Sequence, residues 1–209
     1  MKLLEFPHSH YCEKAKWALS HKGLDSEIVP ILPGLHIRTV KKYAEGTSVP
    51  VLLTAQQNIQ GSSEIIDFLD EKYPQNSLTP TDSQLHSQCI ALEKKMSTKL
   101  GEHLRCILYA YLLKYPSFIA YCFSQPMPWH KRTFVRVLSP LLCKKIYDKF
   151  VTSPQKAEDA RIEFDNAMNE LKQILKNSNY LIGNQFSRAD ITMASMLSLL
   201  VMPKEHPFP

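Results

Sequence analysis

The feature that most constrains the fold of this sequence is a change of pattern around Pro74–Pro80. Before this segment, short apolar runs alternate with amphipathic stretches, which is typical of strands alternating with helices. After it, no stretch has the apolar alternation and turn boundaries of a strand, and helical spacing dominates. We therefore expect an α/β domain at residues 1–75, a linker at 76–80 and an all-helical domain at 81–209.

The first domain is predicted to have the order β-α-β-α-β-β-α. A Ser at position 62 or 63 is expected to cap the last helix, because serine side chains accept hydrogen bonds from free N–H groups at helix starts. Strands are predicted at Lys2–Phe6 and Glu27–Ile31, helices at Tyr11–His21 and Leu35–Tyr43, and a hairpin at Val49–Leu53 and Asn58–Gln60.

The second domain is predicted to contain long helices at Leu85–Leu113 and Lys156–Lys176. Ser187 and Asp190 have capping-box spacing and are expected to start a buried helix at Ile191–Leu200. The apolar stretch at 106–123 is interrupted and too short for a membrane span, so we expect buried helix there. Prolines are expected to break the intervening region into shorter helices; they are Pro116, Pro126, Pro128, Pro140 and Pro154.

The charge and cysteine content exclude several classes of protein. Lys and Arg number 25 against 20 Asp and Glu, but residues 1–74 hold 8 basic and 9 acidic residues, so the surplus belongs to the helical domain. The basic stretch Trp129–Phe150 fits solvated helix faces better than a nucleic-acid site. Five cysteines without metal-ligand spacing favour a reducing compartment and predict neither a disulfide framework nor a metal site. No apolar signal sequence follows Met1, so a cytoplasmic location is expected.

Four motifs occur in an order and spacing that resemble the glutathione transferase superfamily over nearly the whole chain. They are Ser9–Leu19, Ser48–Leu52, Gly61–Glu71 and Gly183–Thr192. The resemblance implies a thioredoxin-like glutathione-binding domain followed by an all-α domain. It also implies a homodimer that uses glutathione as co-substrate, together with a small hydrophobic electrophile.

The resemblance places the thiol of glutathione at the start of the first long helix. Ser9 precedes this helix, where free N–H groups and the helix dipole favour negative charge, and its hydroxyl would stabilise the thiolate. Tyr11 is a second candidate donor. Cys12 matches the second cysteine of the glutaredoxin-like CxxC pattern, so it is either a buried small residue or a reactive thiol.

Two further motifs are implied to hold the glutathione backbone and its γ-glutamyl group. Val49 would pair with the cysteinyl backbone next to a cis bond to Pro50. Ser62 and Ser63, at a helix start, would hold the γ-glutamyl carboxylate. Family members have an acidic residue where this chain has Gly61, so the α-amino group would need Glu64 or Gln60 instead.

For the glycyl carboxylate of glutathione and for the electrophile, the sequence offers several candidate residues each. His36, or else Arg38 or Lys41, is implied to meet the glycyl carboxylate. The electrophile pocket would lie between the domains and involve Tyr109, Tyr111 or Trp129. Conjugation of glutathione to an electrophile is the first hypothesis. Two alternatives stay open: a catalytically weak interaction or regulatory protein, and a thiol reductase using Cys12.

Overall fold

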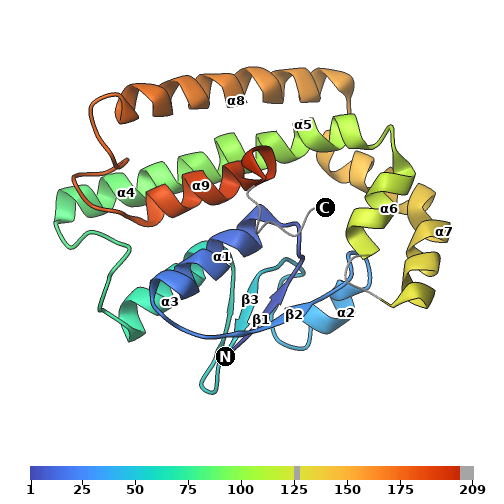
Figure 1. Ribbon diagram of the computed structural model, residues 1–209, viewed down its shortest axis with the longest axis horizontal. Helices are drawn as coiled ribbons and strands as arrows, with labels where there is room; N and C mark the ends of the chain where they lie inside the picture. The colour runs from blue at the N-terminus through green and yellow to red at the C-terminus, as the bar shows by residue number, and fades with distance from the viewer. Residues whose placement is uncertain (125–127, 203–209) are drawn as a thin grey trace.

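The computed structural model describes residues 1–124 and 128–202, so the predicted break at Pro126 lies outside the described residues. The N-terminal domain has the predicted element order, shown in blue to cyan in Figure 1. Its elements are β1 (Lys2–Glu5), α1 (His10–His21), β2 (Glu27–Pro30), α2 (His36–Val40), β3 (Val51–Leu53), β4 (Asn58–Gln60) and α3 (Ser62–Lys72).

The four strands form one mixed sheet in the order β2-β1-β3-β4. β1 is parallel to β2 and antiparallel to β3, and β3 is antiparallel to β4. Because neighbouring side chains in a strand point to opposite faces, Leu3 packs under α1 and α3 while Leu4 packs with Val40 of α2. The sheet is therefore covered on both faces, by α1 and α3 on one side and by α2 on the other.

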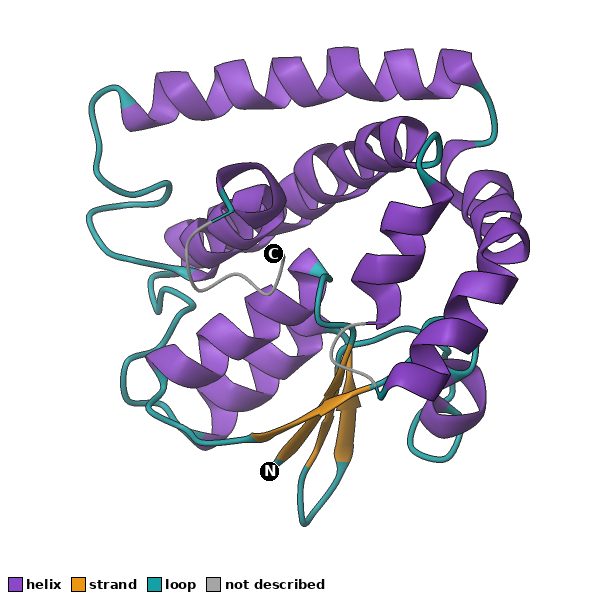
Figure 2. Cartoon of the chain, turned by 45° about the vertical axis from the view of Figure 1, so that its right-hand side comes forward, coloured by secondary structure: helices purple, strands orange, loops and turns teal. Residues whose placement is uncertain are grey.

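The described residues of the C-terminal domain form helices joined by loops and contain no strand, as Figure 2 shows. α9 packs against both α1 and α4, so it joins the two domains. The helices are α4 (Ser83–Met96), the π-helical η1 (Ser97–Glu102), α5 (His103–Leu112), α6 (Pro116–Ser124), α7 (Trp129–Ile146), the π-helical η2 (Tyr147–Val151), α8 (Pro154–Leu175) and α9 (Arg188–Val201). In the part of the chain that the structure covers, no helix is long and apolar enough to cross a membrane.

The prediction that Pro140 breaks a helix is wrong, because α7 continues through it. Proline removes the N–H that would normally bond to the carbonyl four residues earlier, here that of Arg136. The hydroxyl of Ser139 donates to this carbonyl at 2.8 Å. A substitute donor is thus present where the proline removes one.

The capping box that starts α9 is formed by Ser187 and Asp190, as predicted. The Asp190 carboxylate is buried and accepts three hydrogen bonds, from the N–H groups of Leu181 and Ser187 and from the Ser187 hydroxyl, at 2.7–2.9 Å. It therefore ties the loop before α9 to the first turn of that helix.

Replacing Asp190 by Ala should destabilise the protein by about 2 kcal/mol or more, because buried donors lose their acceptor. Urea denaturation followed by circular dichroism measures the effect. Asp82 is the matched control, since it caps the exposed start of α4 through the N–H groups of Gln84 and Leu85. Asp82→Ala should cost less than Asp190→Ala, and equal losses would contradict the structural role assigned to Asp190.

Candidate functional site

The strand register brings three chain segments to one edge of the sheet. Leu4 near the end of β1 lies opposite Val51 at the start of β3, which lies opposite Gln60 at the end of β4. The segments that follow β1, precede β3 and follow β4 therefore meet there. These segments contain Ser9, Val49 and Ser62, three of the residues that the sequence predicts for a site.

Ser9 is half-buried and stands immediately before α1 as its N-cap residue. Its Oγ accepts from the N–H of Cys12 at 3.4 Å, and its own N–H donates to the carbonyl of Phe6 at 3.0 Å. A hydroxyl can donate as well as accept, so Ser9 is also able to donate to a group beyond the helix end. Twelve helical residues follow it, so the α1 dipole also favours an anion at this point.

Cys12 is fully buried in the first turn of α1. Burial raises the pKa of its thiol to about 12, despite a hydrogen bond with Ser9 that acts in the opposite direction. The thiol is therefore protonated near neutral pH, whereas a nucleophilic cysteine needs its thiolate. All five cysteines are free and buried.

The hydroxyl of Tyr11 is directed at the C-terminal domain. It donates to the carbonyl of Ser97 at 2.9 Å, and burial raises its pKa to about 12. Gly101 allows this approach, because a side chain at position 101 would come within 2.9 Å of the Tyr11 hydroxyl. Tyr11 thus connects α1 to η1 and does not share the orientation of Ser9.

The Val49–Pro50 peptide bond is cis, as the sequence predicts. Gln60 holds the segment before it, accepting from the N–H of Gly46 at 3.0 Å and donating to the carbonyl of Ser48 at 2.8 Å. Among the described residues, the N–H and carbonyl of Val49 have no hydrogen-bond partner. Val49 can therefore pair with an extended ligand, whereas the Gln60 amide is already engaged.

The prediction that Ser62 or Ser63 caps α3 is wrong, because Gly61 occupies the N-cap position and no side chain caps it. Gly61 has a φ of +107°, which favours glycine. The Glu64 carboxylate folds back over Gly61 and fills the space that a side chain at position 61 would need. An acidic group therefore stands beside position 61 although the residue itself is glycine.

Ser62 and Ser63 differ in their surroundings. Ser62 is buried in the first turn of α3. The Ser63 hydroxyl accepts from Lys14 Nζ at 2.9 Å and donates to Glu93 Oε1 at 2.8 Å. Ser63 is therefore part of the contact between the domains, which leaves Ser62 and the free N–H groups of this turn to face an anion.

The contact between the domains is centred on an ion cluster that sequence reasoning missed. Glu93 of α4 is buried between Lys14 of α1 and Arg188 of α9, and it forms an ion pair with each. Arg188 also pairs with Asp67 of α3. Burial alone would raise the pKa of Glu93, but the charges of Lys14 and Arg188 outweigh it and hold the pKa below its usual value.

His36 lies at the start of α2, where its ring meets Phe6 edge-on at 4.8 Å between centroids. Phe6 belongs to the loop that leads to Ser9, so His36 reaches the same edge of the sheet. Its Nδ1 accepts from the N–H of Gly34 at 2.9 Å, and burial, aided by the charge of Lys149, lowers its pKa. Arg38 and Lys41 are exposed.

The predicted second-substrate residues are not brought together. Tyr109 packs inside the C-terminal domain, with its ring 5.5 Å from that of Phe150. Trp129 is the first residue of α7 and is 78% exposed, and Tyr111 is also exposed.

Two histidines flank Ser9, one in the loop before it and one at the first position of α1. His8 Nε2 lies 2.5 Å from the carbonyl oxygen of Cys122 in α6. His10 is the first residue of α1 and is buried, and its Nε2 has no hydrogen-bond partner within the described part of the chain. Burial, and then the charge of Arg105, lower its pKa to about 3. A polar residue at the start of an amphipathic helix gave no signal of this burial.

Arg105 reaches this region from the C-terminal domain. Its guanidinium lies 5.8 Å from the centre of the Tyr11 ring and 4.5 Å from that of Phe150. It also borders a pocket of about 250 Å³ between α5, η2 and α8. In the described ranges 1–124 and 128–202, no group of three or more His, Cys, Asp or Glu side chains could hold a metal ion.

The fold and the sheet-edge site define a thioredoxin-like domain joined to an all-helical domain. Residues 3–77 match the family model described as glutathione S-transferase, N-terminal domain, and residues 131–207 match the corresponding C-terminal domain. The chain belongs to the glutathione S-transferase superfamily.

Two curated relatives are from Arabidopsis thaliana. Glutathione S-transferase Z1 is 36% identical over 93 residues, which are 43% of this chain and 41% of the relative. Glutathione S-transferase Z2 is 30% identical over 115 residues, 54% of this chain and 52% of the relative. The matches therefore span about half the length of these relatives.

Solved structures resemble the whole chain. The β-etherase LigF from Sphingobium sp. strain SYK-6 has a TM-score of 0.71 at 22% identity, covering 97% of this chain and 84% of that one. A glutathione S-transferase from Methylobacterium radiotolerans, in complex with glutathione sulfonate, has a TM-score of 0.67 at 19% identity, covering 96% and 78%. A glutathione S-transferase from Methylobacillus flagellatus, with glutathione bound, has a TM-score of 0.66 at 16% identity. The match covers 98% of this chain and 85% of that one. At these identities the likeness concerns the fold.

Proposed function

We propose that the protein is a glutathione transferase that joins the thiolate of glutathione to a small hydrophobic electrophile. In this reaction a carbon–sulfur bond forms, the thiol proton passes to solvent, and the electrophile releases its leaving group with the bonding electrons. The observation that carries the proposal is the position of Ser9, whose hydroxyl stands at the positive end of α1 on the same sheet edge as Val49 and Ser62.

Each part of glutathione has a proposed partner at this edge. The thiolate accepts from the Ser9 hydroxyl, and the cysteinyl backbone pairs with the N–H and carbonyl of Val49 beside Pro50. The γ-glutamyl carboxylate meets Ser62 and the free N–H groups at the start of α3. The α-amino group meets Glu64, and the glycyl carboxylate meets His36.

The electrophile is proposed to enter between the start of α1 and the C-terminal domain, where Tyr11, Arg105 and Phe150 gather. The burial of Cys12 supports conjugation at Ser9 over disulfide reduction, because the reductase alternative needs an accessible thiolate. The buried free thiols also fit a reducing compartment such as the cytoplasm. We further propose that the protein acts as a homodimer, which light scattering would test.

A conjugation assay tests the proposal most simply. Purified protein is mixed with glutathione and a panel of electrophiles such as 1-chloro-2,4-dinitrobenzene, and glutathione binding is measured in parallel by calorimetry. We expect saturable turnover and a glutathione Kd at or below millimolar concentration. Absence of glutathione binding would refute the proposal, and turnover of disulfides that depends on Cys12 would favour the reductase alternative.

The role proposed for Glu64 gives a separate prediction. Glu64→Gln should weaken glutathione binding by about tenfold, because it removes a charge-assisted hydrogen bond to the α-amino group. Affinity for a glutathione analogue that lacks this amino group should not change. Glu71→Gln, exposed at the other end of α3, serves as the control. If calorimetry gives Glu64→Gln the same glutathione affinity as that control, Glu64 does not replace the acidic residue missing at position 61.

A further inference from the structure

α7 carries two apolar faces, and the described structure covers only one of them. Val135, Cys143 and Ile146 are buried against the rest of the helical domain. On the other side, positions 134, 137, 138 and 141 have the spacing of one helix face. Their exposed fractions are 52% for Phe134, 72% for Val137, 40% for Leu138 and 54% for Leu141. We call these four residues the outer face of α7.

Positive charge extends this face at one end. Lys144 and Lys145 follow Leu141 by three and four positions, so they continue the face by one helical turn. Both are exposed, and neither forms an ion pair with another described residue. The α7 sequence Trp129–Ile146 contains no Asp or Glu. A partner for the outer face must therefore be apolar at its centre and negatively charged at its edge.

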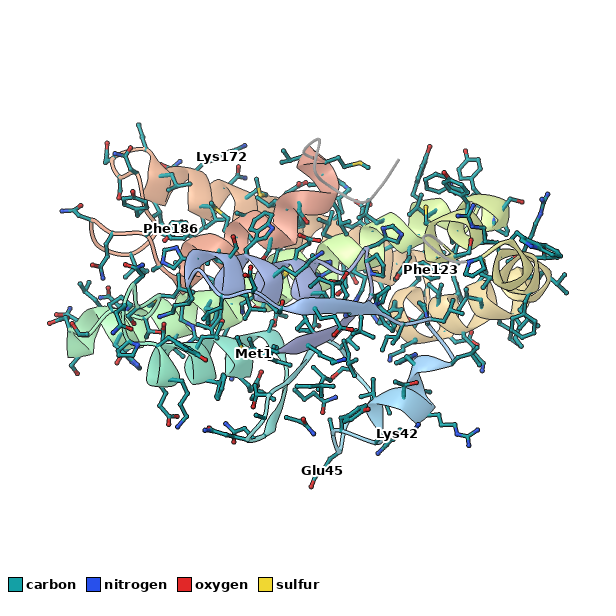
Figure 3. The ribbon with its side chains drawn as sticks, turned by 60° about the horizontal axis from the view of Figure 1, so that its bottom comes forward. Met1, Lys42, Glu45, Phe123, Lys172 and Phe186 are labelled. Atoms are coloured by element: carbon teal, nitrogen blue, oxygen red, sulfur yellow. The ribbon has the colours of Figure 1, made fainter. Side chains whose placement is uncertain are left out.

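The outer face stands where a large surface can reach it. In Figures 1 and 2, α7 forms one outer edge of the molecule, and α6 lies between it and the rest of the structure. Figure 3 shows the side chains of this end spreading outward beyond Phe123 of α6. α6 also exposes Tyr121, while Tyr115 is exposed just before it. The edge therefore presents apolar and aromatic groups together with lysines.

We infer that the outer face of α7 docks on an anionic lipid surface, lying in the interface without crossing the membrane. A helix with an exposed apolar face and neighbouring lysines buries the apolar face among the acyl chains. Its lysines then lie at the acidic headgroups. The long lysine stems reach the headgroups while their Cα atoms stay close to the apolar layer.

The charges and apolar side chains of α7 favour an anionic lipid surface over a second copy of the chain and over nucleic acid. A second copy docking through a twofold axis would bring the same face against itself, and since α7 contains no Asp or Glu, that helix would offer Lys144 and Lys145 no counter-charge. Nucleic acid offers phosphates but no apolar layer for Val137 and Leu141. An acidic lipid surface supplies both components.

Co-sedimentation with vesicles tests the inference on the full chain. We use phosphatidylcholine vesicles with and without about one third phosphatidylserine, at low and at high salt. The protein should bind the anionic vesicles, should bind the neutral ones at least about tenfold more weakly, and should dissociate as salt increases.

Two double variants separate the apolar and the electrostatic contributions. Phe134→Ser with Leu141→Ser, and Lys144→Gln with Lys145→Gln, should each weaken vesicle binding by at least about tenfold. Ile162→Ser is the control, since Ile162 is equally exposed on α8. Because all four positions are exposed, thermal melts and glutathione affinity should be unchanged in both double variants, which separates this test from that of the proposed transferase activity.

Several results would overturn the inference. They are failure of the unaltered protein to bind anionic vesicles, equal binding to neutral vesicles, and unchanged binding in either double variant. Loss of a dimer in Phe134→Ser with Leu141→Ser, without vesicle binding by the parent, would instead assign the face to a second copy. Binding of polyglutamate that matches vesicle binding and is lost in the same variants would assign it to an acidic protein.

Discussion

Replacing Ser9 by Ala is expected to lower kcat/KM for glutathione conjugation by about 10- to 100-fold, because a hydrogen bond to a charged acceptor is lost. In the proposed complex the hydroxyl, at the N-terminus of α1, donates to the thiolate rather than to the glutathione backbone. The Kd for glutathione should therefore change little. Steady-state kinetics with 1-chloro-2,4-dinitrobenzene and calorimetry give the two quantities.

The control for this experiment is Ser9→Thr, which keeps a hydroxyl and should retain most of the activity. Because Ser9 also caps α1, Ser9→Ala is expected to cost about 1 kcal/mol of stability. Thermal melts of both variants establish that the assays are run on folded protein. Equal activity in Ser9→Ala and the parent would show that another group stabilises the thiolate.

Glu93→Gln is expected to destabilise the protein by about 3 kcal/mol or more, because it leaves Lys14 and Arg188 buried without their shared counter-charge. The side chain keeps its size, so the loss is electrostatic rather than steric. The free energy of unfolding from urea titration measures it. α1 of the first domain meets α4 and α9 of the second at this cluster. Glu93→Gln should therefore weaken the contact between the two domains.

The matched control is Glu170→Gln, which removes one carboxylate from the exposed ion pair with Lys95. Exposed pairs contribute little, so this change should cost less than about 1 kcal/mol. If both variants lose the same free energy, the buried cluster does not hold the domains together.

The effect of Glu93→Gln should also depend on pH. The folded-state pKa of Glu93 lies below its ordinary value of 4.5, so its contribution is complete above that pH. It is lost as the pH falls through the folded-state pKa, because the carboxyl group becomes protonated. The difference between the variant and the parent should therefore shrink in acid, and a difference that grows would reverse the assigned sign.

The order of elements could be predicted from sequence because it depends on local patterns. The short apolar runs of β1 and β3, the proline before β3 and the Ser187–Asp190 spacing each act within a few residues. The same local reasoning failed at Pro140, where the hydroxyl of Ser139 supplies a substitute donor. It also failed at Ser62, because the cap position of α3 is occupied by Gly61 in a glycine-favouring conformation.

The contacts between domains could not be predicted from the sequence in this way. Lys14 and Glu93 are separated by 79 positions, and nothing local marks either as buried. The charge of Arg105 that acts on His10 likewise comes from a helix of the second domain. Glu64 was one of two proposed substitutes for an acidic residue at position 61. Only the structure shows that its carboxylate occupies the space beside the Gly61 backbone.

The most direct test of the central proposal is the pKa of the glutathione thiol while it is bound. Ultraviolet difference spectra of the protein with glutathione, recorded across pH, follow the thiolate by its absorbance. We expect the bound thiol to titrate at least about one pH unit below the ordinary cysteine value of about 8.5, and Ser9→Ala to return it toward that value. A bound thiol that titrates like free glutathione in the unaltered protein would contradict the role of the α1 N-terminus and Ser9.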